Sequence, residues 1–347
     1  MRKEKSVLLV FTGGTISMGE NPTNGSLSPL DKDAILKLIP ELEMLPVNIS
    51  SVSFNPMIDS SDVEPNFWVK IAETIREYYD HYDGFVILHG TDTMAYSASA
   101  VSFMLENLSK PVIFTGSQLP LGMLRSDAKD NVMNAIEIAA AYEDNKPVVP
   151  EVALFFEDLL MRGNRAMKKS TEYFNAFASF NYPILAKSGV HIKYFPMVIH
   201  YENEVKPLSI NTHFDNNIAI LKLFPGIQES VVQSVLETPH LRGVILESFG
   251  AGNAPRAEWL YQRLKAATAS GMIIVNVSQC RIGSVEMGRY ETSLNLQKAG
   301  ILSGYDMTIE TATTKLMFLL GKFSDPKEVV KYMHQSLRGE VTIMHGK

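Results

Sequence analysis

Short apolar runs that alternate with longer amphipathic segments constrain the fold of this chain more than any other feature. The runs of the first half are rich in branched and aromatic residues and lie at Ser6–Phe11, Val47–Phe54, Gly84–Leu88, Pro111–Thr115 and Glu151–Phe156. The helical patterns between them lie at Asn66–Tyr82, Thr93–Asn107 and Asp127–Tyr142. Near-continuous apolar strands that alternate with helices are typical of a mostly parallel sheet covered on both faces. The pattern therefore predicts an α/β fold.

The same alternation resumes in the last third of the chain. Its strands and helices are expected at Ile218–Leu223, Gln228–Glu237, Gly243–Glu247, Arg256–Ser270, Gly271–Val277, Thr308–Phe323 and Lys327–Ser336. The stretch before it reads as short extended pieces with two prolines. A chain of 347 residues also exceeds the roughly 250–300 at which one core stops growing. We therefore predict a larger N-terminal mostly parallel-sheet domain (1–190), a linker (191–216) and a smaller C-terminal α/β domain (217–347).

Composition excludes several classes of protein. The net charge of -6 argues against a nucleic-acid or anionic-membrane partner, because both favour basic surfaces. The single cysteine, Cys280, excludes an intrachain disulfide framework and suits a reducing compartment. The apolar run Val7–Phe11 is shorter than the roughly 7–15 residues of a signal-peptide core, and no stretch approaches the roughly 18 of a membrane span. We expect a soluble cytoplasmic protein.

Polar loops follow several of the predicted strands. In open parallel sheets, ligands bind beyond the carboxyl ends of the strands. "TGGTIS" places Thr15 after two glycines that allow close approach of a ligand to the backbone. "HGTDTM" places Thr91 and Asp92 at a second strand end, and "RGNRAMKKS" supplies Lys168 and Lys169, two candidates for the base of a threonine nucleophile. "DSSD" adds Asp59, Ser60 and Ser61, suited to the charged ends of an amino acid.

Each of these residues also has a structural explanation. Thr15 and Asp92 suit helix caps, the lysines suit solvated surface, and "DSSD" suits a surface turn. His89 is expected to pack at a strand end rather than act as a base. The histidines show no metal-ligand spacing such as HExxH, and "TGGTIS" lacks the lysine of a phosphate-binding P-loop. We therefore expect neither a metal nor a cofactor.

Taken together, the loops resemble the L-asparaginase family, in particular the bacterial type I cytoplasmic enzymes. "TGGTIS", "DSSD", "HGTDTMAYSAS", "FTGSQLPL", "RGNRAMK", "FASFNYP" and "GAGNAP" occur in the family's order and span almost the whole chain. The resemblance implies hydrolysis of L-asparagine to L-aspartate and ammonia through an acyl-enzyme intermediate. In that scheme Thr15 is the nucleophile, and Thr91, Asp92 and Lys168 form a second catalytic cluster. Thr12 would then pack and hydrogen-bond at the strand end.

The resemblance also assigns substrate-binding residues and an oligomeric state. Asp92 would receive the α-ammonium group of the substrate, and Ser60, with Asp59 and Ser61 alongside, would hold its α-carboxylate. The backbone N–H groups of Thr15 and Thr91 would stabilise the oxyanion. Family members form a tight dimer, often paired into a tetramer, in which Asn253 of "GAGNAP" reaches the site of a partner subunit.

The sequence departs from the family pattern at two places. Family members carry a tyrosine about ten residues after the nucleophile, whereas this chain has Gly25, Ser26 and Leu27 there. Some type I enzymes bind a regulatory asparagine with an arginine at the end of the "VIL" strand. This chain has Glu247 at that position, although Ser278, Gln279 and Cys280 match the rest of that effector site.

Other functions remain open at this stage. Within the same fold family, the alternatives are a glutaminase-asparaginase or the amidase subunit of an amidotransferase. The latter carries an additional N-terminal domain, for which we expect no room before Ser6. Outside the family, a non-catalytic amino-acid-binding protein or a nucleotide-binding protein would also use glycine-rich strand ends. The joint presence of Thr15, Thr91, Asp92 and Lys168 argues for an enzyme.

Overall fold

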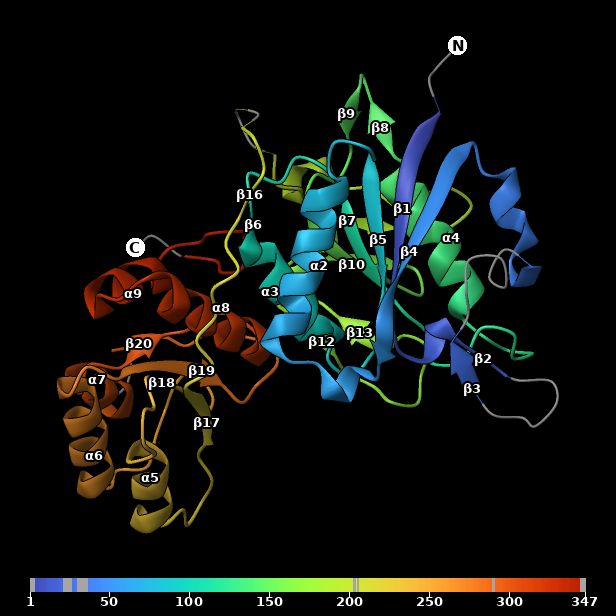
Figure 1. The fold of residues 1–347 in the computed structure, drawn as a ribbon. Helices are drawn as coiled ribbons and strands as arrows, with labels where there is room; N and C mark the ends of the chain where they lie inside the picture. The colour runs from blue at the N-terminus through green and yellow to red at the C-terminus, as the bar shows by residue number, and fades with distance from the viewer. Residues whose placement is uncertain are drawn as a thin grey trace. The chain divides into compact units, whose positions relative to one another are not determined.

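The computed structural model describes residues 4–20, 27–29, 37–201, 204, 206–288 and 291–343. The chain divides into two compact units, Met1–Thr212 and His213–Lys347. Each unit contains its own sheet with helices on both faces, as Figure 1 shows. The division at residue 212 falls within the 191–216 stretch that we expected to be a linker.

The sheet of the first unit is built around its first strand. β1 (Lys5–Gly13) pairs in parallel with β4 (Val47–Ile58) on one side and with β5 (Gly84–Leu88) on the other. The full order of the eight-stranded sheet is β15-β14-β11-β10-β7-β5-β1-β4. The additional strands are β7 (Val112–Thr115), β10 (Val152–Phe156), β11 (Leu159–Arg162), β14 (Ala186–Lys187) and β15 (Lys193–Tyr194). The predicted strands thus all form, and they supply the parallel part of the sheet.

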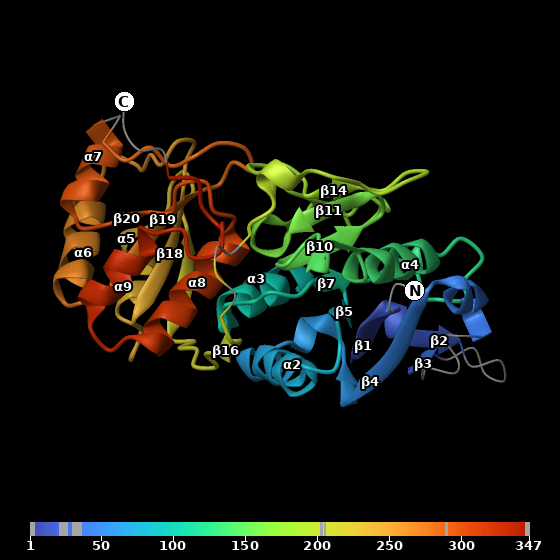
Figure 2. The ribbon, with the colours of Figure 1, turned by 90° about the horizontal axis from the view of Figure 1, so that it is seen from above.

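Helices cover this sheet on opposite faces, as seen from above in Figure 2. On one face, α4 (Ala128–Ala139) packs Val132 and Ile136 into one core with Leu9 of β1 and Val86 of β5. The other face carries α3 (Met94–Met104), with α2 (Pro65–Tyr78) packed beside it. The central strands are apolar along their length because both of their faces are buried.

Part of the sheet differs from the prediction. β11, β14 and β15 extend it in the antiparallel direction, and none of them was expected as a strand. β14 and β15 are two residues long, too short for a periodic pattern in the sequence. β15 and β16 (Ser209–Ile210) lie within the expected linker, yet they pair with β14 and β6 (Leu105–Glu106) of the first unit.

The remaining short elements of the first unit connect the larger ones. They are η1 (Thr15–Ser17), β2 (Met18–Glu20), β3 (Leu27–Pro29), η2 (Pro40–Met44), η3 (Ser60–Asp62), β8 (Tyr142–Glu143), β9 (Lys146–Pro147), η4 (Gly163–Arg165), β12 (Met167–Lys168), β13 (Phe177–Ala178) and η5 (Pro196–Val198). Of these, η1, η3 and β12 lie within the stretches TGGTIS, DSSD and RGNRAMKKS that the sequence singles out.

The second unit is a smaller parallel α/β layer structure. Its sheet has the order β17 (Ile218–Lys222), β18 (Gly243–Ser248), β19 (Ile273–Ser278) and β20 (Leu302–Ser303). The helices are α5 (Glu229–Leu236), α6 (Glu258–Ala269), α7 (Glu291–Lys298), α8 (Ile309–Lys322) and α9 (Pro326–Met333).

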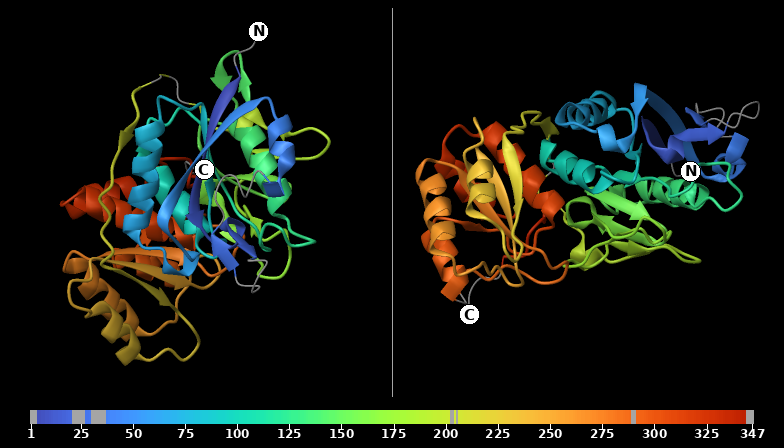
Figure 3. Two further views of the ribbon diagram at one scale, coloured as in Figure 1. Left: turned by 45° about the vertical axis from the view of Figure 1, so that its right-hand side comes forward. Right: turned by 90° about the horizontal axis from the view of Figure 1, so that it is seen from below.

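Helices flank the small sheet on both faces, as the views in Figure 3 show. Val232 of α5, Leu264 of α6 and Leu296 of α7 share a core with Leu246 of β18, and α8 packs on the sheet from the other side. The α/β class with a larger and a smaller sheet is thereby confirmed. In the described ranges, no helix is long and apolar enough to cross a membrane.

Candidate active site

Four loops of the first unit meet at one edge of its large sheet. β1, β4, β5 and β7 run in parallel, so their carboxyl ends lie at the same edge. In register, Gly13 lies opposite Ile58, and Leu88 lies opposite Thr115. The loops that follow contain Thr15, Ser60, Thr91 and Gly116. A crevice at this edge is where open α/β sheets bind their ligands.

The two glycines after β1 bring the first and third of these loops into contact. Gly13 and Gly14 have φ values of +132° and +79°, which favour glycine. The Gly14 N–H donates to the carbonyl oxygen of Ile58 (3.2 Å). A Cβ at Gly14 would lie 2.2 Å from the Cα of Gly90, so no side chain fits between the loops.

Thr15 begins η1 directly after this turn and is half-buried. Thr12 has a different role, because its hydroxyl is buried and donates to the carbonyl oxygen of Leu88 (2.9 Å). This confirms that Thr12 packs at the strand end. Gly25 and Ser26, where family members carry a tyrosine, lie outside the described residues, and Leu27 begins β3.

Lys168 contacts both residues that the sequence analysis placed with it. Its Nζ donates to Thr91 Oγ1 at 2.8 Å and to Asp92 Oδ1 at 2.7 Å. These residues are 77 and 76 positions apart in the chain. The Lys168 side chain is only 16% exposed, whereas that of Asp92 is 62% exposed. The Lys168 side chain is therefore largely shielded from solvent, whereas the Asp92 carboxylate is open to it.

The backbone around Lys168 holds it in this position. β12 pairs with β13, with Lys168 opposite Phe177. The N–H of Lys169 donates to the carbonyl oxygen of Ala176 (2.7 Å), which closes the hairpin. Lys169 follows the last residue of β12, and because neighbouring residues of an extended chain point to opposite sides, we expect its side chain to point away from Thr91.

Ser60 joins the Asp59 loop to the Thr91 loop. It is 4% exposed, its Oγ accepts the Asp92 N–H at 3.3 Å, and its carbonyl oxygen accepts the Thr93 hydroxyl at 2.7 Å. Asp59 instead makes local contacts, because its Oδ1 accepts both the N–H and the hydroxyl of Ser61 (2.8 Å each). These hydrogen bonds lower the pKa of Asp59.

His89 is a buried part of the framework, as the sequence analysis expected. It is 1% exposed, and its two ring nitrogens contact the carbonyl oxygen of Gly90 (2.7 Å) and Ser97 Oγ (2.9 Å). Because a carbonyl only accepts, Nδ1 carries the proton and Nε2 accepts from Ser97. Ser97 in turn accepts from the indole N–H of Trp68 (3.0 Å). Burial lowers the pKa of His89 to about 4.

Sequence reasoning missed the residues that fix the loop after β7. The Asp127 carboxylate accepts the backbone N–H groups of Gln118 and Leu119 and the side-chain amide of Asn131. A Cβ at Gly116 would lie 2.4 Å from the carbonyl oxygen of His89, so this loop also abuts the Thr91 loop. From the sequence, an Asp at the start of a helix is interpreted as a helix cap, and its neighbours in the chain do not indicate that it binds the N–H groups of Gln118 and Leu119.

Asn253 lies at the carboxyl edge of the small sheet in the second unit. It follows Gly252 (φ +102°) and forms an isolated β-bridge with Phe249. Its Oδ1 accepts the hydroxyl of Thr292 (2.8 Å), and the amide of Asn276 reaches the carbonyl oxygen of Gly252 (3.3 Å). Within the described ranges, the amide NH₂ of Asn253 has no hydrogen-bond partner.

The expected effector residues also lie at this edge. Glu247 Oε2 is 3.6 Å from Lys222 Nζ, and the Glu247 side chain is 14% exposed. The Ser278 hydroxyl donates to the carbonyl oxygen of Gly250 (2.6 Å) and accepts the Cys280 N–H (2.9 Å). Cys280 is exposed. The single hydroxyl proton of Ser278 is thus already donated to the Gly250 carbonyl oxygen within the loop.

A grouping of His, Cys, Asp or Glu side chains that could hold a metal ion is absent from the described part of the chain. The cluster at the edge of the large sheet consists instead of hydroxyls, one lysine and the carboxylates of Asp59 and Asp92. Such groups attack a carbonyl carbon and move protons.

Comparisons with known proteins identify the family. Residues 6–199 match the family profile described as "Asparaginase, N-terminal", and residues 217–333 match "Glutaminase/Asparaginase C-terminal domain". L-asparaginase 1 of Escherichia coli (strain K12) is 45% identical over 350 residues, with 98% of this chain and 99% of that protein covered. The 60 kDa lysophospholipase of Homo sapiens is 38% identical over 348 residues, with 99% of this chain and 59% of that protein covered.

Solved structures agree with the sequence comparisons. The crystal structure of L-asparaginase I from Vibrio cholerae O1 biovar eltor superimposes with a TM-score of 0.89 at 42% identity, covering 98% of this chain and 100% of that one. The L-asparaginase from Thermococcus kodakarensis gives a TM-score of 0.87 at 32% identity, over 97% and 99% of the two chains. With both halves matched in sequence and the whole chain matched in structure, this chain belongs to the asparaginase family.

Proposed function

We propose that this chain hydrolyses L-asparagine to L-aspartate and ammonia through a threonine acyl-enzyme. The observation that carries the proposal is the contact of Lys168 with Thr91 and Asp92, which joins a base, a hydroxyl and a carboxylate at the strand edge where Thr15 lies. The family relationship supports the choice of substrate, because L-asparaginase 1 of Escherichia coli is similar over the full chain.

In the first step, Thr15 Oγ attacks the side-chain amide carbon of asparagine. A C–O bond forms, and the carbonyl electrons move to an oxyanion held by the N–H groups of Thr15 and Thr91. One such donor typically contributes a factor of about 10²–10³ to kcat. The carbonyl then re-forms, the C–N bond breaks, and the amide nitrogen leaves as ammonia after taking up the proton from the Thr15 hydroxyl.

In the second step, water hydrolyses the ester between Thr15 and the aspartyl group. Thr91 Oγ1 accepts a hydrogen bond from Lys168, so its own proton is free to orient a water or to be transferred. Asp92 stabilises the ammonium form of Lys168 after the lysine has taken up a proton. The water oxygen ends on aspartate, and Thr15 recovers its proton.

The charged ends of the substrate would be bound by the neighbouring loop. Among the described residues, one oxygen of the exposed Asp92 carboxylate has no hydrogen-bond partner, and this oxygen would accept the α-ammonium group. Ser60 Oγ accepts the Asp92 N–H, so its own proton can be donated to the α-carboxylate, with Asp59 and Ser61 alongside. Asn253 would donate its amide NH₂ to the site of a partner subunit, in a cytoplasmic dimer or tetramer.

Replacement of the nucleophile tests the reaction. Thr15→Ala should abolish ammonia release, because no covalent intermediate can form, while calorimetry should still detect asparagine binding to a folded protein. Turnover within tenfold of wild type would refute the assignment. Running the same assay with glutamine separates an asparaginase from a glutaminase-asparaginase.

The oligomeric state has a separate test. Activity should sediment with a dimer or larger species, and Asn253→Ala should raise KM without changing the sedimenting mass. A fully active monomer would refute the role of Asn253 between subunits.

A further inference from the structure

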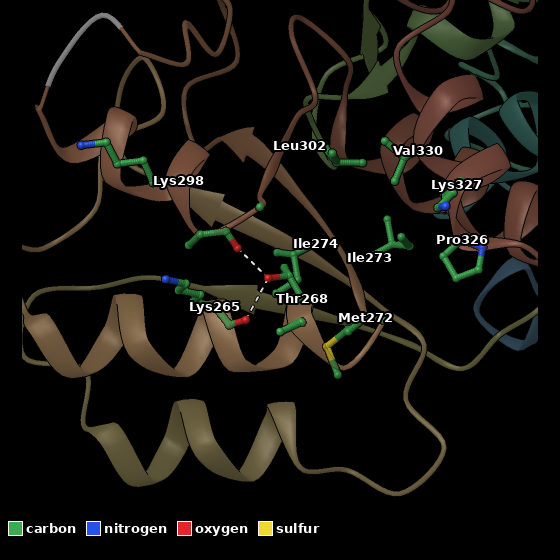
Figure 4. A pocket seen from close by; sticks show the side chains of 14 residues that line it. Lys265, Thr268, Met272, Ile273, Ile274, Lys298, Leu302, Pro326, Lys327 and Val330 are labelled. Atoms are coloured by element: carbon green, nitrogen blue, oxygen red, sulfur yellow. Dashed lines mark hydrogen bonds between the residues drawn. The ribbon is translucent and has the colours of Figure 1, made fainter.

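The second unit contains a hollow at the amino-terminal edge of its sheet, opposite the edge that carries Asn253. Its floor includes the first residues of β19 and β20, Ile273 and Leu302. The last turn of α6, around Thr268, and the start of α9, at Pro326, form its walls (Figure 4). Its volume is about 500 Å³, within the roughly 300–1,000 Å³ of small-molecule sites. The proposed reaction uses none of these residues.

The floor of the hollow is apolar. Met272, Ile273 and Ile274 are nearly buried, and Val330 of α9 faces them across the hollow in Figure 4. The hydroxyl of Thr268 lies near the middle, but it is 2.6 Å from the carbonyl oxygen of Ala299, to which it donates. It is therefore already satisfied, and the floor suits a hydrocarbon chain.

The rim of the hollow is positively charged. Lys265, Lys298 and Lys327 line it, and no Asp or Glu does. Lys265 and Lys298 lie at one end and Lys327 at the other, with the apolar side chains between them (Figure 4). Within the described ranges, none of the three lysines forms an ion pair.

The two acidic residues beside the α9 part of the rim, Asp325 and Glu328, do not line the hollow. The Asp325 carboxylate accepts the backbone N–H of Lys327 (2.9 Å), which caps α9. Glu328 pairs with Lys331 (3.0 Å) and does not line the hollow. The rim thus keeps an excess of positive charge over an apolar floor.

We propose that this hollow binds a single-chain amphiphile with an anionic head group. The head would lie between Lys265 and Lys298, whose paired charges exceed that of Lys327, and the chain would cover Ile273 and Met272. A simple anion would leave the floor uncovered, and an uncharged apolar molecule would leave the lysines without a partner. Only a ligand with both parts matches the charge and the surface together.

Sodium octanoate, below its critical micelle concentration, is the probe. Calorimetry on the full chain should show saturable binding to one site per chain. Acetate, which lacks the chain, and octan-1-ol, which lacks the charge, should each bind at least tenfold more weakly. Binding should also weaken in added salt, because exposed charges are screened. Equal binding of octanoate and acetate, or of octanoate and octanol, would overturn the proposal.

Variants test whether octanoate binds in this hollow. Lys265→Gln/Lys298→Gln should lower the octanoate affinity at least tenfold, and Lys331→Gln, at a lysine outside the hollow, should leave it unchanged. Ala269→Trp should fill the hollow and abolish binding. All variants should keep the wild-type rate of ammonia release. Unchanged octanoate affinity in both Lys265→Gln/Lys298→Gln and Ala269→Trp would refute the site. A smaller sedimenting mass of Ala269→Trp would show that a second copy of the chain covers the hollow instead.

Discussion

Replacement of Lys168 by methionine is the sharpest test of the proposed proton transfer. Methionine keeps the length of the buried stem but removes the ammonium group that contacts Thr91 Oγ1 and Asp92 Oδ1. Groups that transfer protons contribute about 10²–10⁴ to a rate. We therefore expect kcat to fall at least about a hundredfold, which corresponds to about 2.7 kcal/mol of transition-state stabilisation at 1.36 kcal/mol per decade.

The same change should cost little stability. The partner carboxylate, Asp92, is 62% exposed, and pairs with exposed charges contribute only about 0–1 kcal/mol. Thermal unfolding of Lys168→Met should therefore stay within a few degrees of wild type. A large loss of activity at nearly constant stability distinguishes a catalytic role from a structural one.

Two further variants complete this experiment. Lys169→Met removes the adjacent lysine, which follows β12 and should point to the other side of the extended chain, so the rate of ammonia release should stay within about threefold of wild type. Lys168→Arg keeps the charge and the ion pair, but an arginine cannot give up its proton in a protein, so this variant should be as inactive as Lys168→Met. Steady-state ammonia release over a wide range of asparagine concentrations measures all three. Equal, small losses in Lys168→Met and Lys169→Met would refute the placement of the lysine, and a fully active Lys168→Arg would refute proton transfer.

Three other predictions follow from the described contacts. Lys315 and Glu340 form a fully buried ion pair (2.6 Å), so Lys315→Met should lower the free energy of unfolding by about 3–5 kcal/mol in denaturant titrations, and Lys315→Met/Glu340→Leu should recover part of it. A single variant as stable as wild type would contradict this. His89→Gln should keep kcat within tenfold of wild type. Burial lowers the pKa of His89 from 6.5 to about 4, so between pH 4 and 6.5 the unfolded wild-type protein binds more protons than the folded protein. The free energy of unfolding of the wild type should therefore fall more steeply than that of the variant as the pH drops from 6.5 to 4. Parallel stability–pH curves would contradict this. Asparagine kinetics should be hyperbolic, with a Hill coefficient near about one, because the Glu247 carboxylate repels the α-carboxylate of an effector in the expected pose and an effector that does not bind shifts no equilibrium. Sigmoidal kinetics abolished by Ser278→Ala would show that the effector site functions despite Glu247.

Several features of the site were predictable because they depend on local sequence. Apolar runs bounded by polar loops located β1, β4, β5, β7 and β10, and the loops after them contained Thr15, Ser60 and Thr91. The parallel arrangement then placed the loops at one edge, since carboxyl ends of parallel strands meet there. Strands β14 and β15 were not predicted, because two residues are too few for a period to show, and α7 was missed because its sequence, ETSLNLQK, is mostly polar. Strand β11 was not predicted either.

The sequence by itself determined the α/β class, the covering of a mostly parallel sheet by helices on both faces and the family, because these depend on periodicity and on ordered motifs along the chain. Tertiary structure alone decided which residues meet. The contact of Lys168 with Thr91 joins positions 77 apart, and the bare backbone of Gly14 is needed because Gly90, from the loop after β5, lies against it. The pairing of Lys315 with Glu340 likewise depends on the packing of the segment after α9 against α8, and the lysine-rimmed hollow of the second unit depends on the placement of α6 and α9. Such contacts depend on strand register and helix packing, which bring distant residues within hydrogen-bonding distance and leave no trace in the local pattern of either residue.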